Sequence, residues 1–227
     1  MPSSGEFVST EEAARILGVT VQHVRRLADS GEVTRIARGL IDRSSLDRFL
    51  TERQGGRTRV WAEHTAWGAI ALLSGDTSSW LGRVQASRLR SALRAVTDPA
   101  DLVVRTRGRA KVHTFTGHPA AVNRLTEMMA VADQAALGLA IGPIEPGTAE
   151  GYLAADTLDA TVRYLGLRKD PDGNVVVRAT GFDFDVVTHL ASRSATVAAL
   201  DAATSLDPRV RGVGERAITE ILDRYRR

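Results

Sequence analysis

The fold at the start of this chain is decided by residues 7–31, which run FVSTEEAARILGVTVQHVRRLADSG. Ser9 or Thr10 is suited to cap a helix, and Glu12 follows Ser9 at the spacing of a capping box. Gly18 is suited to end that helix, because glycine accepts the positive φ that helix ends often require. One apolar face at helical spacing lies between these signals, made of Ala13, Ile16 and Leu17. The pattern predicts a first short helix.

A second short helix is predicted directly after it. Thr20 is suited to cap it and Gly31 to end it. Its apolar positions are Val21, Val24, Leu27 and Ala28. The remaining positions fall mainly on other faces, toward solvent or a ligand, and hold Gln22, His23, Arg25 and Arg26. Two short helices joined by a tight turn are a compact way to place a helix in the major groove of DNA.

The next residues predict a hairpin and a third helix. Residues 33–41, interrupted by Gly39, are suited to a small hairpin with Arg35 and Arg38 near its tip. Ser44 or Ser45 is expected to open a helix that buries Leu46, Phe49 and Leu50.

In these residues the chain resembles a known family. The segments STEEAARILGVTVQHVRRLADSGEV and IDRSSLDRFL look like the winged helix-turn-helix of excisionases and MerR-type regulators, over about residues 6–52. The resemblance implies that the second helix meets bases and phosphates and that the wing touches the DNA backbone. The segment between Gly31 and Ile41 is short for such a wing. The alternative is a small helical domain that contacts only proteins.

The resemblance also implies which side chains meet DNA. On the recognition helix they are Thr20, Gln22, His23, Arg25 and Arg26, and on the wing they are Arg35 and Arg38. Glutamine pairs bidentately with adenine, and arginine with guanine or phosphate. The alternative for each arginine is that it is an exposed, solvated charge with no contact to DNA.

Composition excludes several classes of protein. The chain has no cysteine, which excludes disulfides and thiolate metal sites. No apolar run reaches the length of a membrane span, and residues 1–30 lack the pattern of a signal peptide. We therefore expect a cytoplasmic protein without membrane contacts. The net charge is +6 over residues 1–113 and −3 over residues 114–227. The basic first half suits phosphate binding.

The polar, glycine-containing residues 51–59 indicate a boundary between two domains. We predict an α+β protein, with a winged helix-turn-helix at residues 1–53 and a larger mixed domain at residues 60–227 that binds a partner, a second copy, or both. In the larger domain, helices are predicted at residues 61–73, 80–96, 119–131, 194–203 and 214–224. Strands are predicted at residues 102–106, 110–115 and 175–178. The helix at 80–96 is expected to bury Trp80, Leu81, Val84, Leu89, Leu93 and Val96, and to expose Arg83, Arg88, Arg90 and Arg94.

A second resemblance covers about a third of the chain. Residues 151–180 (GYLAADTLDATVRYLGLRKDPDGNVVVRAT) and 197–222 (VAALDAATSLDPRVRGVGERAITEIL) look like the carboxy-terminal region of AbiEi-like antitoxins. Those proteins repress their own promoter and oppose a nucleotidyltransferase toxin. The first domain departs from that family, since it is excisionase-like.

Other motifs leave alternatives open. Residues 211–217 resemble a helix-hairpin-helix in which Gly212 and Gly214 would grip a phosphate, or they form a glycine-containing loop before the last helix. Asp183 and Asp185 could hold a divalent metal, or lie on the polar side of a half-buried strand. The five histidines, which are His23, His64, His113, His118 and His189, form no pair at zinc-ligand spacing. No phosphate-binding loop, dinucleotide motif or nucleophile elbow occurs, so we expect no enzyme and no cofactor. The alternative is an enzyme tethered to DNA, in which scattered Asp, His and Ser side chains converge in space.

The function predicted is a DNA-binding regulator. Its specific form is an antitoxin that binds its own operator in double-stranded DNA and masks a toxin encoded nearby. The alternative is an excisionase-like or ligand-responsive regulator whose second domain dimerises. A homodimer is expected because one helix-turn-helix contacts few phosphates. Candidate contacts for pairing or toxin binding are Val197, Leu200, Ile218, Ile221 and Leu222, although this pattern is more typical of ordinary core.

Overall fold

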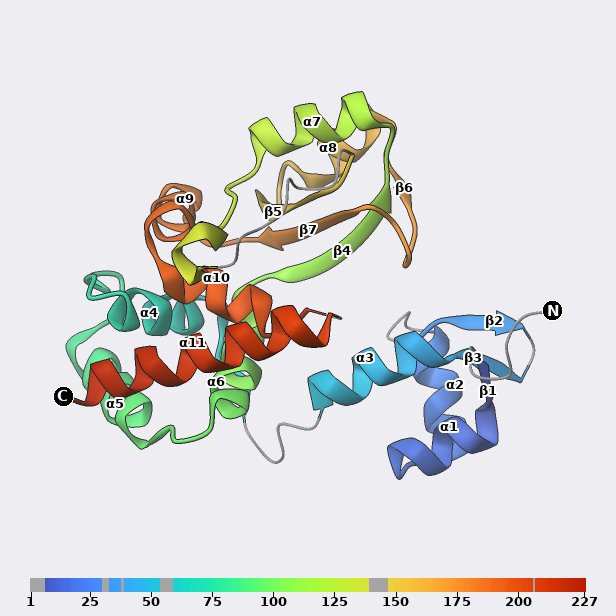
Figure 1. Ribbon diagram of the computed structural model, residues 1–227, viewed down its shortest axis with the longest axis horizontal. Helices are drawn as coiled ribbons and strands as arrows, with labels where there is room; N and C mark the ends of the chain where they lie inside the picture. Colours follow the sequence, from blue (N-terminus) through green and yellow to red (C-terminus); the bar gives the residue numbers. More distant parts are fainter. Residues whose placement is uncertain (1–6, 30–32, 38, 54–58, 139–146, 206) are drawn as a thin grey trace. The chain divides into compact units, whose positions relative to one another are not determined.

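A computed structural model describes the chain apart from residues 1–6, 30–32, 38, 54–58, 139–146 and 206, and apart from the side chains at 44, 48 and 51–53. The chain divides into two compact units, Met1–Gly56 and Arg57–Arg227, which we call the front unit and the rear unit. Each unit combines helices with a sheet, and the rear unit is the larger (Figure 1). The chain therefore has the predicted α+β class, with a winged helix-turn-helix first.

The front unit contains three helices and a small sheet within its described residues. These elements are β1 (Phe7–Ser9), α1 (Thr10–Leu17), α2 (Val21–Asp29), β2 (Arg35–Ala37), β3 (Leu40–Asp42) and α3 (Arg43–Arg53). The expected capping signals are confirmed: the Ser9 side chain accepts a hydrogen bond from the Glu12 amide, and Gly18 ends α1 with a φ of +63°. Gly31, expected to end α2, lies outside the described residues.

The sheet of the front unit has the strand order β1-β3-β2, with both pairs antiparallel. The hairpin of β2 and β3 agrees with the sequence pattern, whereas β1 was not predicted. Asp42, rather than Ser44 or Ser45, caps α3: its carboxylate accepts a 2.7 Å hydrogen bond from the amide of Ser45, which lies inside the helix. The core of this unit includes Ala13 of α1 and Val24 of α2, which are fully buried.

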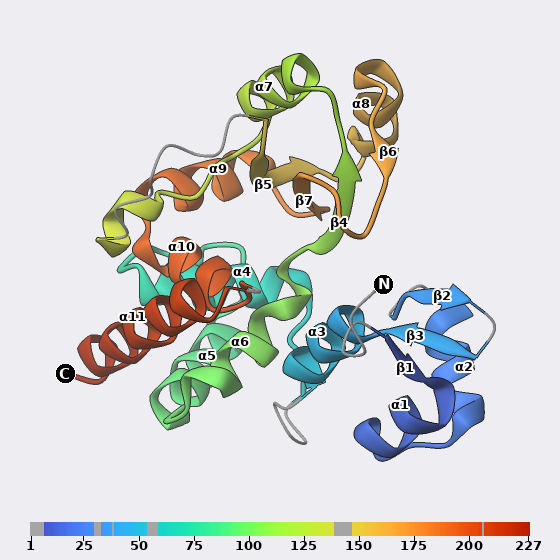
Figure 2. The ribbon, with the colours of Figure 1, turned by 45° about the vertical axis from the view of Figure 1, so that its right-hand side comes forward.

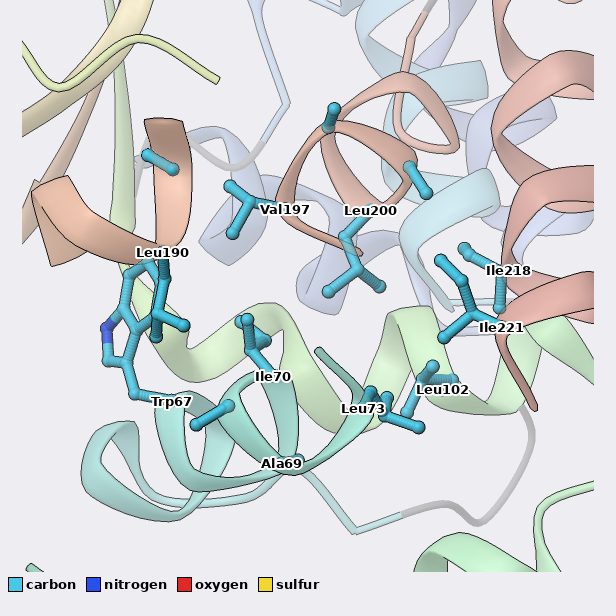
Figure 3. Close-up of a cluster of buried hydrophobic side chains, with 14 of the residues drawn as sticks. Trp67, Ala69, Ile70, Leu73, Leu102, Leu190, Val197, Leu200, Ile218 and Ile221 are labelled. Carbon is cyan, nitrogen blue, oxygen red and sulfur yellow. The ribbon is translucent and has the colours of Figure 1, made fainter. Parts of the chain in front are cut away.

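The rear unit has a helical layer built around one central helix. Its elements are α4 (Glu63–Leu73), α5 (Arg83–Ala95), α6 (Pro99–Thr106), α9 (Phe184–Arg193), α10 (Ala195–Ala202) and α11 (Pro208–Arg226). Nearly every residue of α4 from Ala66 onward is buried, because neighbouring helices surround it. Figure 3 shows its Trp67 and Ile70 among side chains of α6, α9, α10 and α11. The residues considered for pairing, Val197, Leu200, Ile218, Ile221 and Leu222, all belong to this core.

The described residues of the rear unit also form a four-stranded mixed sheet with the order β5-β7-β4-β6. The strands are β4 (Lys111–Thr116), β5 (Ala149–Ala154), β6 (Arg168–Lys169) and β7 (Val175–Thr180). β5 and β7 are parallel, and the other pairs are antiparallel. α7 (Pro119–Met128) and α8 (Leu158–Leu165) pack on one face and share a hydrophobic cluster with it (Figures 1 and 2). Short 3₁₀ turns occur at Arg107–Arg109 and Gln134–Leu137.

Two expectations for the segment between residues 80 and 106 were wrong. Residues 102–106 form the end of α6, not a strand, because Asp98 caps the helix and Pro99 occupies its first position. These start signals override the β-branched Val103 and Val104. Val84 is 66% exposed rather than buried, because α5 turns only Ala86, Leu89 and Leu93 toward the core.

The glycine pair near the C-terminus lies inside a helix. α11 begins at Pro208, so Gly212 and Gly214 form neither a helix-hairpin-helix nor a loop. A Cβ on Gly214 would lie 2.3 Å from the Ala203 amide nitrogen and 2.7 Å from the Ala199 carbonyl oxygen. Glycine is therefore required here by the close approach of α11 to α10.

Asp183 and Asp185 do not lie on a strand. Asp183 caps α9, where its carboxylate accepts hydrogen bonds from the amides of Asp185 and Val186. Asp185 occupies the first turn of α9, where a negative charge is stabilised by the helix dipole. Both aspartates are thus accounted for by the start of a helix. Among the described residues, no helix has the length and hydropathy required to cross a bilayer.

Candidate DNA-binding surface

The turn between α1 and α2 orients the second helix. The Val19 amide donates to the Ala14 carbonyl over 3.0 Å, which closes the turn after Gly18. Thr20 caps α2, as predicted: its Oγ1 accepts a 3.2 Å hydrogen bond from the His23 amide. Val24 and Leu27 are buried and hold α2 against the rest of the unit.

The opposite side of α2 faces solvent. Gln22, Arg25 and Arg26 are exposed, and His23 is half-buried at the flank. At about 100° per residue, positions 22, 25, 26 and 29 fall on one side of the helix, away from Val24. Gln22 and the two arginines have the donors and acceptors that fit base edges or phosphates. The structure therefore brings together the side chains that the sequence predicts for the recognition helix, with Thr20 exposed at its start.

The wing is short and is connected to α2 by a charged contact. β2 and β3 have three residues each, and Gly39 between them has a φ of +83°. Arg35 Nη2 donates to Asp29 Oδ1 over 2.9 Å and to the Arg25 carbonyl over 3.3 Å. The Arg35 charge is therefore offset by Asp29. Arg38, the other predicted wing contact, lies outside the described residues.

Two features of this surface are not indicated by the sequence. Asp29 places a carboxylate on the exposed side of α2, next to the arginines. Ile36 and Leu40 of the wing are 50% and 40% exposed, so the wing presents apolar as well as basic side chains. Asp29 and Arg35 lie on different elements, α2 and β2, so no helical or strand repeat relates them and the sequence carried no signal for this pair.

Comparison with known proteins agrees with this geometry. Residues 7–54 match the family model of a helix-turn-helix domain. The matched segment contains α1, α2, the wing and α3 of the front unit. No curated protein and no solved structure matches the chain. The match indicates DNA binding by the front unit and covers none of the rear unit.

The matched region is not basic, although the basic first half of the chain was expected to bind phosphate. Residues 1–53 contain eight arginines and eight acidic residues, so their net charge is zero. The +6 of the first half comes from residues 57–113, which contain ten basic and four acidic residues. The helix-turn-helix segment therefore has suitable side chains on α2 but no net charge that would attract DNA from a distance.

The rear unit contains a buried polar network of a different kind. Asp201 of α10 accepts hydrogen bonds of 2.7 Å from both Arg109 and Tyr152, and lies 3.2 Å from Arg178. Arg178 Nη1 also lies 2.6 Å from Glu150. Burial disfavours the charged form of Arg178, but the charges of Asp201 and Glu150 outweigh it and raise its pKa. Burial also raises the pKa of Tyr152, which keeps its hydroxyl as a donor.

This network joins the two layers of the rear unit. Tyr152 and Arg178 come from β5 and β7, whereas Asp201 comes from α10. All three side chains, together with Arg109, are buried. Nothing in the sequence indicated it, because its members lie far apart along the chain. Since Asp201 is buried and pairs with both buried arginines and with Tyr152, we assign the network to structure rather than to ligand binding.

Proposed function

We propose that this chain is a DNA-binding transcriptional regulator whose helix α2 enters the major groove. The observation that carries the proposal is the exposure of Gln22, Arg25 and Arg26 on the side of α2 opposite its buried residues. This arrangement lies in the segment that matches a helix-turn-helix domain. In such domains, the first residues of the second helix contact base edges while neighbouring groups contact phosphates.

Each side chain has a role in this proposal. Gln22 lies in the first turn of α2 and pairs with an adenine, and Arg25 or Arg26 pairs with guanine or with phosphate. Thr20 and His23 border the start of α2, where unpaired backbone amides favour a phosphate. In this proposal, Arg35 and Arg38 contact the DNA backbone from the wing.

The test is a binding measurement on the duplex upstream of the chain's own gene, against a random duplex. We expect Arg25→Ala/Arg26→Ala to lose about 1–3 kcal/mol for each base contact removed, and with it the preference for the upstream duplex. The matched control is Arg15→Ala/Arg43→Ala, which removes two charges from α1 and α3. The control should keep the preference. Unchanged preference in the α2 variant would refute the assignment.

We further propose that the regulator is the antitoxin of a toxin–antitoxin operon. Support comes from the resemblance of residues 151–180 and 197–222 to AbiEi-like antitoxins. In this proposal the rear unit masks a nucleotidyltransferase toxin in the cytoplasm, by binding and without catalysis of its own. The test is co-expression with the neighbouring gene: rescue of growth and co-purification are expected. An integrase in that position, with no rescue, would favour the excisionase-like alternative.

Pairing of two chains on two half-sites is part of the proposal. A single helix-turn-helix contacts few phosphates, so specific binding is usually achieved by dimers. Because Val197, Leu200 and Ile218 are core residues, deletion of residues 194–227 would unfold the rear unit and would not test pairing. Light scattering on the full chain, free and bound to its upstream duplex, is the appropriate measurement. A tight complex that contains one chain per duplex would contradict the proposal that two chains bind together.

A further inference from the structure

Helix α5 of the rear unit carries an unusual concentration of positive charge. Its thirteen residues include four arginines and no acidic residue. We call the set of Arg83, Arg88, Arg90 and Arg94 the α5 arginine face. All four are exposed. Within the described part of the chain none of them forms an ion pair or a hydrogen bond, so their charges are available to a partner.

The positions of these arginines follow the helical repeat. Residues 83, 90 and 94 fall within about 40° of one another around the helix axis and form a stripe, whereas Arg88 lies about 140° around the axis from Arg83. The buried side of α5 consists of Ala86, Leu89 and Leu93, so the arginines point away from the core. α5 lies at the edge of the helical layer in both views (Figures 1 and 2). The arginine stripe is therefore a solvent-facing edge of the rear unit.

The length of the stripe suits an extended polyanion. Positions 83 and 94 are separated by about 16 Å along the helix, over which one strand of B-DNA presents about five phosphates. Guanidinium groups bind phosphate bidentately and stay charged at any physiological pH. Ser87 lies among these arginines, and Val84, which is 66% exposed, lies between Arg83 and Arg88 around the axis. α5 contains no aromatic residue, whereas protein interfaces are usually anchored by aromatic side chains.

The charge distribution of the chain supports the same partner. The front unit carries the base-contacting side chains, but residues 1–53 have no net charge. Two other arginines of the same region are already engaged, Arg105 with Asp101 and Arg109 with Asp201. The α5 arginines are thus the main available source of electrostatic attraction in the +6 segment, residues 57–113.

We infer that the α5 arginine face is a second DNA-binding surface, which contacts the phosphate backbone without regard to sequence. This inference rests on the proposed function, since it assumes that the front unit binds the same duplex. The two surfaces have different roles: α2 selects the DNA sequence, and the α5 arginine face increases the affinity for any duplex. Because one chain carries both, the second contact is made at a high effective concentration once the first has formed.

The experiment measures binding of the full chain to labelled duplexes over a series of salt concentrations. The variant is Arg83→Gln/Arg88→Gln/Arg90→Gln/Arg94→Gln. The charge-matched control is Arg163→Gln/Arg168→Gln/Arg193→Gln/Arg209→Gln, which removes four exposed charges from α8, β6, α9 and α11. A third variant with lysine at the four α5 positions keeps the charge. Thermal melting checks that all of them fold.

We expect the slope of log K against log salt to become shallower by up to about 3.6 in the glutamine variant, at about 0.9 for each lost phosphate contact. The affinity should fall by the same factor for the upstream duplex and for a scrambled duplex. The control and the lysine variant should keep most of the slope. This pattern is distinct from that of Arg25→Ala/Arg26→Ala, which should lose the preference between duplexes.

A glutamine variant with the slope of the wild type would overturn the inference and leave the proposed function intact. A control that loses as much slope as the variant would also overturn it, because net charge alone would then explain the effect. Loss of binding to the neighbouring gene product, with an unchanged slope, would assign the face to a protein partner instead. A wild-type chain that binds no duplex would refute both proposals.

Discussion

Arg35 in the wing strand β2 donates a 2.9 Å hydrogen bond to Asp29, the last residue of helix α2. The same guanidinium donates to the Arg25 carbonyl. The wing is thereby attached to the C-terminal end of the recognition helix. The contact also places a carboxylate beside the arginines expected to meet DNA, where it opposes phosphate binding.

Asp29→Asn should therefore strengthen DNA binding. The substitution removes the negative charge and frees the Arg35 guanidinium for a phosphate. We expect a several-fold gain in affinity at low salt that shrinks as salt rises. The pair is 41% and 64% exposed, so the stability of the front unit should change by less than about 1 kcal/mol. Fluorescence anisotropy at two salt concentrations measures the gain, and weaker binding by the variant would contradict the prediction.

The two glycines of α11 should respond in opposite directions to alanine. Gly214→Ala places a methyl group against the backbone of α10 and should cost about 1–3 kcal/mol of stability. Gly212→Ala meets only the end of the Arg216 side chain, 3.5 Å away, and should gain about 1 kcal/mol from helix propensity. Urea unfolding of both variants gives the comparison. Equal effects at the two positions would argue against the helical packing described for this segment.

Asp201→Asn should destabilise the rear unit by about 3–5 kcal/mol, because it leaves two buried arginines without their shared carboxylate. Glu150→Gln is the comparison variant. It removes the other partner of Arg178, but Glu150 is 42% exposed and water can replace part of the contact, so we expect a smaller loss. Chemical denaturation followed by tryptophan fluorescence reports both. A larger loss of stability for Glu150→Gln than for Asp201→Asn would contradict the prediction that Asp201 is the more important partner of Arg178.

Residues 60–227 should fold without the front unit. The two hydrophobic clusters of the rear unit contain no residue of the front unit, whose own cluster is separate. The three tryptophans, Trp61, Trp67 and Trp80, all belong to the rear unit, so their fluorescence follows that unit alone. The fragment should melt cooperatively at the midpoint that tryptophan fluorescence gives for the full chain. A fragment with no cooperative transition would mean that the boundary cuts a shared core.

Local signals explain what the sequence could predict. The caps at Ser9 and Thr20 and the end of α1 at Gly18 depend on residues within three or four positions, so they were predicted and confirmed. The exposed side of α2 follows from the same helical repeat. For this reason the recognition-helix surface, although not its contacts with DNA, could be derived before the structure.

Features that depend on distant residues could not be derived. Gly214 resembles a loop residue in sequence, yet it lies inside a helix because α10 approaches it closely. The aspartate at 183 follows an alternation typical of a strand, whereas its carboxylate caps α9. The Asp201 network joins residues up to 92 positions apart, and no local pattern marks such a contact.

The contacts of α11 have a consequence for the order of events during synthesis. α11 packs against α4, α5 and α6, so the core around α4 stays incomplete until residues 208–226 have been made. The front unit needs only the first 56 residues. At about 5–20 residues per second, the remaining chain takes on the order of 10–30 s to emerge. On every nascent chain, the helix proposed to contact DNA is therefore complete before the unit proposed to capture a partner.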